Sequence, residues 1–195
     1  MEEKQDTREI SVGEKIKVLR EQRGLSLKDV ADRTGFSTAL ISQMENHLVS
    51  PSLGTLIRLA NALDVKVGDF FGETHEEPFA IVRKDERKTV SRFASKDGVK
   101  YGYGYESLGF EKKNRHMEPF IIDIHPTPEE SHKLSSHEGE EFIYVLSGEI
   151  EIFYGKDVHK LNIGDSIYYD SIVPHDVHAA GKEDAKILAV VYTPF

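Results

Sequence analysis

The sequence predicts a two-domain protein of the α + β class, in which an all-α N-terminal domain is followed by an all-β C-terminal barrel. Its 195 residues are enough for two domains of ordinary size and too few for three. Apolar residues recur at helical spacing as far as residue 71, whereas short runs of β-branched and aromatic residues dominate the rest. We therefore expect a helical domain over residues 12–72, a linker over residues 73–79 and a barrel over residues 80–195.

The composition excludes several classes of protein. The chain lacks the stretch of about 18 apolar residues that a membrane span needs. Residues 1–11 are largely charged and contain no apolar core of a secretory signal, so we expect a short disordered tail there. The absence of cysteine excludes disulfides and thiolate metal sites, and it fits a cytoplasmic location.

The net charge of −9 is divided unevenly along the chain. Residues 1–72 carry 10 Lys and Arg against 11 Asp and Glu, a balance of −1, so the remaining residues account for −8. The acidity therefore belongs to the second domain, and the first domain remains free to approach DNA.

Capping residues divide the first domain into five expected helices. Ser26 is placed to cap the second helix, and Gly35 supplies the bend that ends it. Ser37 then caps the third helix and Ser52 the fourth, while residues 67–71 close the domain as a fifth, short helical segment. Because only a few residues separate the second and third helices, this pair is expected to form a helix-turn-helix.

Three segments of this domain resemble the phage-repressor (Xre) helix-turn-helix family. They are Ser26-Leu-Lys-Asp-Val-Ala31, Gly35-Phe-Ser-Thr-Ala-Leu-Ile-Ser-Gln-Met-Glu-Asn46 and Ser50-Pro-Ser-Leu-Gly-Thr-Leu56. The resemblance covers residues 12–71 and implies a five-helix, lambda-repressor-like fold whose third helix enters the major groove of DNA. It also implies an ion pair between Arg20 and Glu45 that joins two helices.

The resemblance implies which side chains contact DNA. They are Lys28, Ser37, Thr38, Ala39, Ser42 and Gln43. Gln43 is suited to read a base, because its amide can pair with N6 and N7 of adenine, while Ser37 and Thr38 suit phosphates or a thymine methyl group. One such helix contacts too few bases to select an operator, so we expect a homodimer that reads two half-sites about 34 Å apart.

The second domain reads as a series of short strands. The runs are residues 79–82, 101–105, 120–124, 142–146, 150–154, 166–169 and 187–192. Short strands that follow one another with turn residues between them predict a small antiparallel barrel or jelly roll.

Two segments of this domain resemble the motifs of the cupin superfamily, whose fold is a jelly-roll barrel. They are His137-Glu-Gly-Glu-Glu141-Phe-Ile-Tyr-Val-Leu-Ser-Gly148 and the stretch from Gly164-Asp-Ser-Ile-Tyr-Tyr169 to Val173-Pro-His175. The resemblance implies that His137, Glu141 and His175 hold a divalent metal such as Fe, Zn, Mn or Ni. Imidazole and carboxylate groups are ligands of these metals. The even spacing of His137 and Glu141 would also place them on one face of a single strand.

The cupin motifs are incomplete in this chain. Ser135 stands where the family has its first histidine, which leaves three ligands rather than four. Two interpretations remain open, namely a facial triad of two histidines and one carboxylate with open coordination positions, or a former metal site that now binds an organic ligand. Tyr103 and Tyr105 alternate with glycines, and they either line the ligand pocket or pack against another sheet.

Two functions are compatible with these features. The pairing of an Xre-like helix-turn-helix with one cupin domain resembles a class of bacterial transcriptional regulators whose barrel dimerises the protein and binds a small effector. The chain also resembles the hydroxypropylphosphonate epoxidase family of mononuclear non-haem iron enzymes, which would use His137, Glu141 and His175. In that family a lysine of the helical domain contacts the substrate, whereas Gly24, next to Arg23, stands at its position here. The intact pattern of residues 37–46 leads us to favour a regulator that is not an enzyme.

Overall fold

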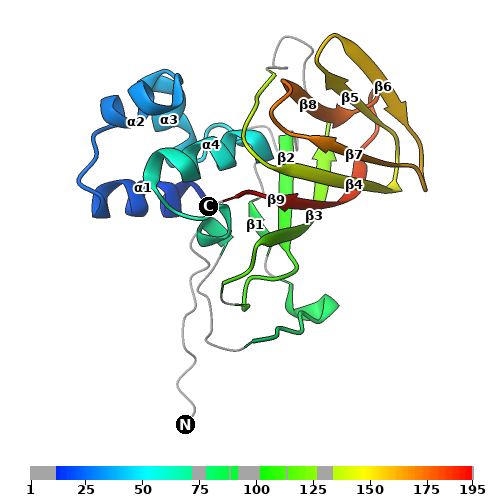
Figure 1. Cartoon of the computed structure of the whole chain (residues 1–195), viewed down its shortest axis with the longest axis horizontal. Helices are drawn as coiled ribbons and strands as arrows, with labels where there is room; N and C mark the ends of the chain where they lie inside the picture. Colours follow the sequence, from blue (N-terminus) through cyan, green and yellow to red (C-terminus); the bar gives the residue numbers. More distant parts are fainter. Residues whose placement is uncertain are drawn as a thin grey trace.

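The computed structural model of the chain describes residues 12–71, 78–87, 89–91, 102–112, 114–126 and 134–194. The expected tail, residues 1–11, and residues 73–77 of the expected linker lie outside the described residues. Figure 1 shows the helices gathered to one side of the β domain. No helix in the described ranges is long and apolar enough to cross a membrane.

Four α-helices make up the described part of the N-terminal domain. They are α1 (Val12–Gln22), α2 (Leu27–Thr34), α3 (Thr38–Glu45) and α4 (Leu53–Leu63). The segment expected as a fifth helix is a 3-10 helix, η1 (Val67–Phe71), so the expected count of five α-helices is not confirmed. A segment of five residues makes little more than one turn, and such short turns commonly use the tighter i to i+3 bonding, as between the Asp69 amide and the Lys66 carbonyl.

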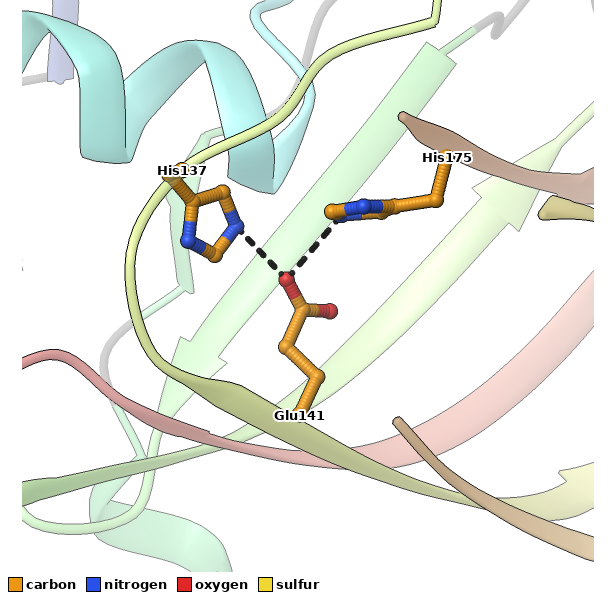
Figure 2. A group of neighbouring side chains, drawn as sticks. All are labelled: His137, Glu141 and His175. Carbon is orange, nitrogen blue, oxygen red and sulfur yellow. Dashed lines mark hydrogen bonds and ion pairs between the residues drawn. The ribbon is translucent and has the colours of Figure 1, made fainter. Parts of the chain in front are cut away.

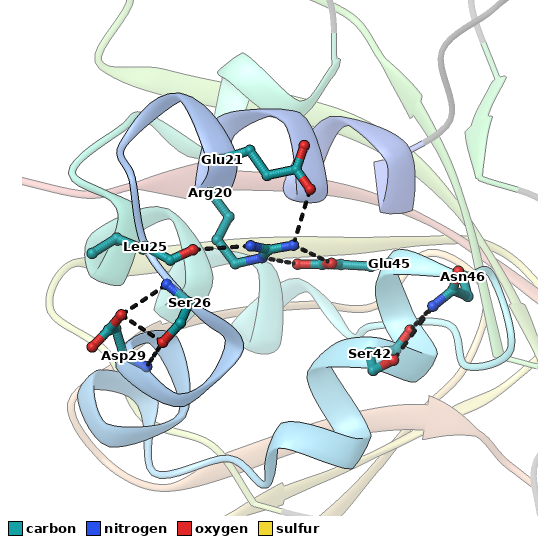
Figure 3. A network of polar contacts seen from close by, with 8 residues as sticks. All are labelled: Arg20, Glu21, Leu25, Ser26, Asp29, Ser42, Glu45 and Asn46. Atoms are coloured by element: carbon teal, nitrogen blue, oxygen red, sulfur yellow. Dashed lines mark hydrogen bonds and ion pairs between the residues drawn. The ribbon is translucent and has the colours of Figure 1, made fainter.

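Local hydrogen bonds explain where the helices of the helix-turn-helix begin. At the start of α2 the Ser26 hydroxyl accepts from the Asp29 amide at 3.1 Å, and the Asp29 carboxylate accepts from the Ser26 amide at 2.7 Å (Figure 3). Gly35 ends α2 with a φ of 72°, which glycine adopts without strain. The Ser37 hydroxyl caps α3. Because only residues 35–37 separate α2 from α3, the two helices form the expected helix-turn-helix.

The C-terminal domain is built from two antiparallel sheets. The larger sheet has the strand order β1-β2-β3-β9-β4-β7, and the smaller sheet has the order β6-β5-β8. The strands are β1 (Thr89–Ser91), β2 (Gly102–Ser107), β3 (Met117–His125), β4 (Glu140–Ser147), β5 (Ile150–Tyr154), β6 (Asp157–Leu161), β7 (Ser166–Asp170), β8 (His175–Ala179) and β9 (Ala185–Tyr192). In β4 and β9 buried residues alternate with more exposed ones, so one face of the larger sheet points into the barrel.

Some strand expectations differ from the structure. Residues 79–82 form no strand, and the side chains of Phe79 and Ile81 are exposed. Conversely, β6 and β8 match none of the expected runs, because both are rich in polar residues. A strand is held by backbone bonds to its neighbours, so the sheet context outweighs the side-chain pattern in these segments.

The two domains share one apolar core at η1. The ring of Phe71 lies 4.7 Å from that of Phe120 on β3 and 5.8 Å from that of Tyr105 on β2, measured between centroids. Next to them Gly68 lies against a buried ion pair, in which Nε of Arg115 is 2.7 Å from Oε2 of Glu118. A Cβ atom on Gly68 would overlap the Arg115 guanidinium, so glycine permits this close approach.

Candidate functional site

The helix α3 presents a polar face to solvent. Thr38, Ala39 and Gln43 are exposed and Ser42 is half-buried, whereas Ile41 and Met44 on the opposite face are buried in the core. This division follows the helical period, since residues three and four apart lie on one face. In the described part of the chain, this face therefore leaves Thr38, Ala39 and the Gln43 amide accessible.

The flanking candidates for DNA contact are also accessible. Ser37 is exposed, although its hydroxyl already accepts from the Leu40 amide at 3.1 Å as the cap of α3. Lys28 on α2 is exposed and forms a surface ion pair with Asp32, with 2.6 Å between Nζ and Oδ2. Such an exposed pair is weak, so the Lys28 ammonium can exchange Asp32 for a phosphate at little cost.

An ion pair connects the end of α3 to α1. Nε of Arg20 lies 2.6 Å from Oε1 of Glu45, and Nη2 of Arg20 lies 2.9 Å from Oε2, while Nη1 donates to the Leu25 carbonyl (Figure 3). This two-point geometry holds α3 in a defined orientation and does not face the exposed side chains of that helix.

A buried cluster of three side chains lies inside the barrel. Nε2 of His137 is 2.9 Å and Nε2 of His175 is 3.4 Å from the same carboxylate oxygen, Oε1 of Glu141 (Figure 2). His137 is 5% exposed, and Glu141 and His175 are each 3% exposed. One potential ligand atom from each lies within 4.8 Å of the others, which brings the three expected ligands together.

Different elements position the three side chains. Glu141 lies in β4 opposite Tyr169 of β7, and His175 is the first residue of β8. His137 precedes β4, so the expectation that it shares a strand with Glu141 is wrong. The chain turns between them at Gly139, whose φ is 111°, and a Cβ there would overlap the carbonyl oxygen of Tyr192. The turn, not the strand period, aims His137 at the carboxylate.

Hydrogen bonds to backbone carbonyls orient both imidazole rings. Nδ1 of His137 lies 3.1 Å from the Glu138 carbonyl oxygen, and Nδ1 of His175 lies 2.8 Å from that of Val173. A carbonyl oxygen only accepts, so each Nδ1 carries a proton and each Nε2 is directed at Glu141. Backbone bonds of this kind leave Nε2 as the ligand atom of metal-binding histidines, so the donor set fits a divalent cation that would replace the contacts of the two Nε2 atoms with Glu141.

The surroundings keep Glu141 ionised. Burial raises the pKa of Glu141, but hydrogen bonds from His137 and His175 outweigh it and hold the pKa at about 2. The Tyr169 hydroxyl donates to the other carboxylate oxygen at 2.8 Å. Burial lowers the pKa of His175, but its bond to Glu141 reverses the effect, so this pKa is raised. A concentrated negative charge with two imidazoles beside it is compatible with a divalent metal.

A cavity of about 30 Å³ adjoins the cluster. Its lining includes Tyr103, Tyr105, Ser135, Glu141, His175 and Asp176, together with apolar residues of the barrel. Burial raises the pKa of both tyrosines, so they remain protonated. The Tyr103 hydroxyl donates to the Val177 carbonyl at 2.7 Å, and the Tyr105 ring also packs on Phe71 and Phe120. The two interpretations of these tyrosines thus coexist, because they both line the cavity and pack.

The cavity has a wall that sequence reasoning missed. Ser52, Leu53 and Gly54, from the first turn of α4 in the helical domain, line it beside the barrel residues. Gly54 carried a signal in the sequence, since a glycine inside an expected helix often marks a close approach of another segment. The sequence pattern did not indicate that the segment approaching Gly54 is the one that contains Ser135 of the barrel.

Two family descriptions match separate parts of the chain. One described as a helix-turn-helix matches residues 16–70, and one described as a cupin domain matches residues 123–191. The first covers the helices α2, α3 and α4, and the second covers all three residues of the buried cluster.

Three known proteins illustrate what the whole chain is similar to. It is 25% identical over 188 residues to the HTH-type transcriptional regulator PuuR of Escherichia coli, covering 95% of this chain and 96% of PuuR. It is 30% identical over 200 residues to (S)-2-hydroxypropylphosphonic acid epoxidase of Streptomyces wedmorensis, covering 95% and 98% of the two chains. A crystal structure of an HTH_3 family transcriptional regulator from Vibrio cholerae matches with a TM-score of 0.61 and 27% identity over 96% and 97% of the chains. The chain therefore belongs to the family of proteins that join an Xre-like helix-turn-helix domain to a cupin domain.

Proposed function

We propose that this protein is a sequence-specific DNA-binding transcriptional regulator whose cupin domain dimerises it and binds a small effector, a divalent metal, or both. The observation that carries the proposal is the exposed polar face of α3, which is capped, oriented by the pair of Arg20 and Glu45, and left uncovered. The likeness to regulators of E. coli and V. cholerae over nearly the whole chain supports it.

The roles of the α3 residues follow from their chemistry. Gln43 pairs with N6 and N7 of an adenine, and Ala39 contacts a thymine methyl group. Thr38, Ser42 and Ser37 reach phosphates or base edges near the start of the helix, and Lys28 contacts the DNA backbone.

Dimerisation through the larger sheet is supported by its outer face. The exposed apolar side chains on this outer face are Met117, Tyr144, Leu146, Tyr168 and Tyr192. They belong to the adjacent strands β3, β9, β4 and β7, so they form one continuous patch rather than scattered exposed residues. A second copy that covers this patch would remove it from water and pair two reading helices.

In the metal-bound form, His137, Glu141 and His175 would be the protein ligands. A divalent ion such as Fe, Zn, Mn or Ni supplies Lewis acidity and open positions that an oxygen donor of the effector can occupy. The residues of the chain supply the rest, since the backbone bonds at Nδ1 orient the histidines and Tyr169 orients Glu141.

Selective binding to genomic DNA fragments at one fixed salt concentration tests the regulator. We expect the wild-type protein to enrich a small set of fragments, and a Thr38→Ala, Gln43→Ala variant to lose at least tenfold in affinity for them, since each good base contact contributes about 1–3 kcal/mol. Lys17→Ala, an exposed change on α1, is the control and should bind as wild type does. Absence of any selective binding by the wild type, with and without Zn(II), would remove the proposal.

A second function is favoured by the similarity to the epoxidase and by the triad itself. As an enzyme, the protein would use His137, Glu141 and His175 to hold iron, with Tyr103 and Tyr105 in the substrate cavity. Arg23, beside the position of the lysine in that family, donates to the Asp64 carbonyl at 2.6 Å and is thus already engaged. Oxygen uptake by the iron-loaded protein with (S)-2-hydroxypropylphosphonate would establish the enzyme, and its absence would leave the regulator.

A further inference from the structure

The cavity beside the triad has one wall that does not belong to the barrel. We call residues 50–54, which include the first turn of α4, the roof. Within it Ser52, Leu53 and Gly54 line the same cavity as Glu141 and His175. A ligand that enters the barrel therefore touches the DNA-binding domain directly.

The roof lies in close contact with the barrel at Gly54. A Cβ atom on Gly54 would overlap Oγ of Ser135 and lie 3.2 Å from its Cβ and 3.8 Å from Cδ2 of His137. Glycine within a helix costs about 1 kcal/mol relative to alanine, so its presence in α4 is explained by this contact and not by helix stability. Ser135 is the barrel residue that this glycine approaches, so the two small residues together permit the close contact.

Among the described residues, three side-chain hydrogen bonds fasten the roof to the barrel. The Ser50 hydroxyl accepts from the Tyr103 amide at 3.2 Å and donates to the Tyr103 carbonyl at 3.1 Å, and the Tyr105 hydroxyl donates to the Pro51 carbonyl at 3.1 Å. Each such bond contributes about 1 kcal/mol net. Apart from Ser135, which forms an isolated bridge to His175, the other residues of the lining belong to strands that are paired with their neighbours, so we expect the roof to yield first.

The volume of the cavity decides which ligands leave the roof in place. A water molecule needs about 10–15 Å³ of such volume. A cavity of about 30 Å³ thus has room for an ion or two water molecules, but not for an organic molecule of several non-hydrogen atoms. Such a molecule fits only if the cavity widens, and the roof is the wall that we expect to give way.

The helical domain is built to move as one body when the roof is displaced. Nη1 of Arg33 on α2 donates to the Ala62 carbonyl of α4 at 2.8 Å, and Arg58 of α4 donates to the Thr34 carbonyl of α2. An open polar space of about 400 Å³ lies between α4 and residues 136 and 137 of the barrel, so rotation meets no packed side chains there. The contact of Phe71 at η1 with Phe120 on β3, neither of which lines the cavity, supplies a pivot.

We propose that the roof is the coupling element of the protein: an organic effector lifts residues 50–54 off the barrel and turns the helical domain about η1, whereas a metal ion alone leaves the roof closed. In the dimer this rotation changes the spacing of the two α3 helices and hence the affinity for the operator. The inference rests on the proposed function for its biological meaning, but the motion itself is measurable without DNA.

The test uses the absence of native cysteine. Spin labels at Lys17→Cys on α1 and Lys156→Cys between β5 and β6, both exposed, report the distance between the domains by double electron–electron resonance. Gly54→Leu places a wedge under the roof and stands in for the effector. We expect its distance distribution to shift by several ångströms or to broaden, and Zn(II) alone to leave the wild-type distribution unchanged. Asn61→Leu, exposed on the same helix, is the matched control and should match wild type.

A second variant tests the proposal even if the Gly54→Leu variant does not fold. Ser50→Ala with Tyr105→Phe removes the fastening bonds without adding bulk, and it should populate the same displaced distances. Unchanged distributions in a folded wedge variant or in this double variant would overturn the proposal, as would a shift caused by Zn(II) alone. A failed search for an operator would instead count against the regulator, because the distance measurement does not depend on DNA.

Discussion

The guanidinium of Arg20 on α1 and the carboxylate of Glu45 at the end of α3 form a two-point ion pair, with side chains only 11% and 4% exposed. This pair joins α3, which carries the residues proposed to contact DNA, to the first helix of the domain. It therefore sets the orientation of α3 without contacting the cavity or the exposed face.

Removal of one partner of this pair should destabilise the helical domain strongly. Glu45→Gln leaves a buried guanidinium without its counter-charge, and we expect a loss of about 3 kcal/mol in the free energy of unfolding. Urea unfolding followed by circular dichroism measures it. Glu21→Gln is the control, because Glu21 is an exposed partner of Arg20 at 3.5 Å and should contribute less than about 1 kcal/mol. Equal effects of the two changes would contradict a structural role for Glu45.

Metal binding should depend on the charge of Glu141. Glu141→Gln keeps the size of the side chain but removes the anion between His137 and His175, so we expect the affinity for Zn(II) to fall about 100-fold or more. Isothermal titration calorimetry on metal-stripped protein provides the measurement. Zn(II) at 100 times its Kd should stabilise the wild type by about 2.7 kcal/mol. His159→Asn, an exposed histidine of β6, should bind as wild type does.

The stability of the barrel should fall at high pH because of His178. Burial lowers the pKa of His178, but bonds to Asp176 and then Glu151, each 3.3 Å away, reverse this, so the pKa is raised. A histidine that binds its proton more tightly in the folded state stabilises the fold fully below its ordinary pKa of 6.5 and loses this contribution as the pH rises through the raised value. Unfolding measured from pH 5.5 to 9 should show the loss, and His178→Asn should reduce it and leave the part that comes from the raised pKa of His175. If the free energy of unfolding of that variant falls equally steeply with pH, another group causes the pH dependence.

The oligomeric state should respond to charge on the outer face of the larger sheet. Tyr144 and Tyr168 are 38% and 64% exposed on the adjacent strands β4 and β7, so Tyr144→Lys with Tyr168→Glu interrupts the apolar patch. We expect the dimer dissociation constant to rise at least 100-fold in sedimentation velocity. Val158→Lys, which changes an exposed apolar residue of the smaller sheet, is the control. A wild-type protein that sediments as a monomer would contradict the dimer proposal outright.

Much of the helical domain was predictable because its boundaries depend on local bonds. The box of Ser26 and Asp29, the bend at Gly35 and the cap at Ser37 all join residues at most four apart, and such bonds form wherever the chain is helical. The three candidate ligands were identified through the resemblance to cupins, and the structure brings them together. The strands β6 and β8 were not identified, because their polar sequences are strands only by virtue of their pairing with β5.

The sequence by itself determined the order of the two folds, the polar face of α3 and the identity of the His137, Glu141 and His175 set. Only the tertiary structure decided that His137 reaches Glu141 through a turn at Gly139, and that Gly54 of one domain closes on Ser135 of the other. The physical reason is the range of the contacts. Caps and helical faces follow from spacing along the chain. The roof instead forms where two folded domains meet, and nothing in the sequence indicates that residues 54 and 135 lie in contact.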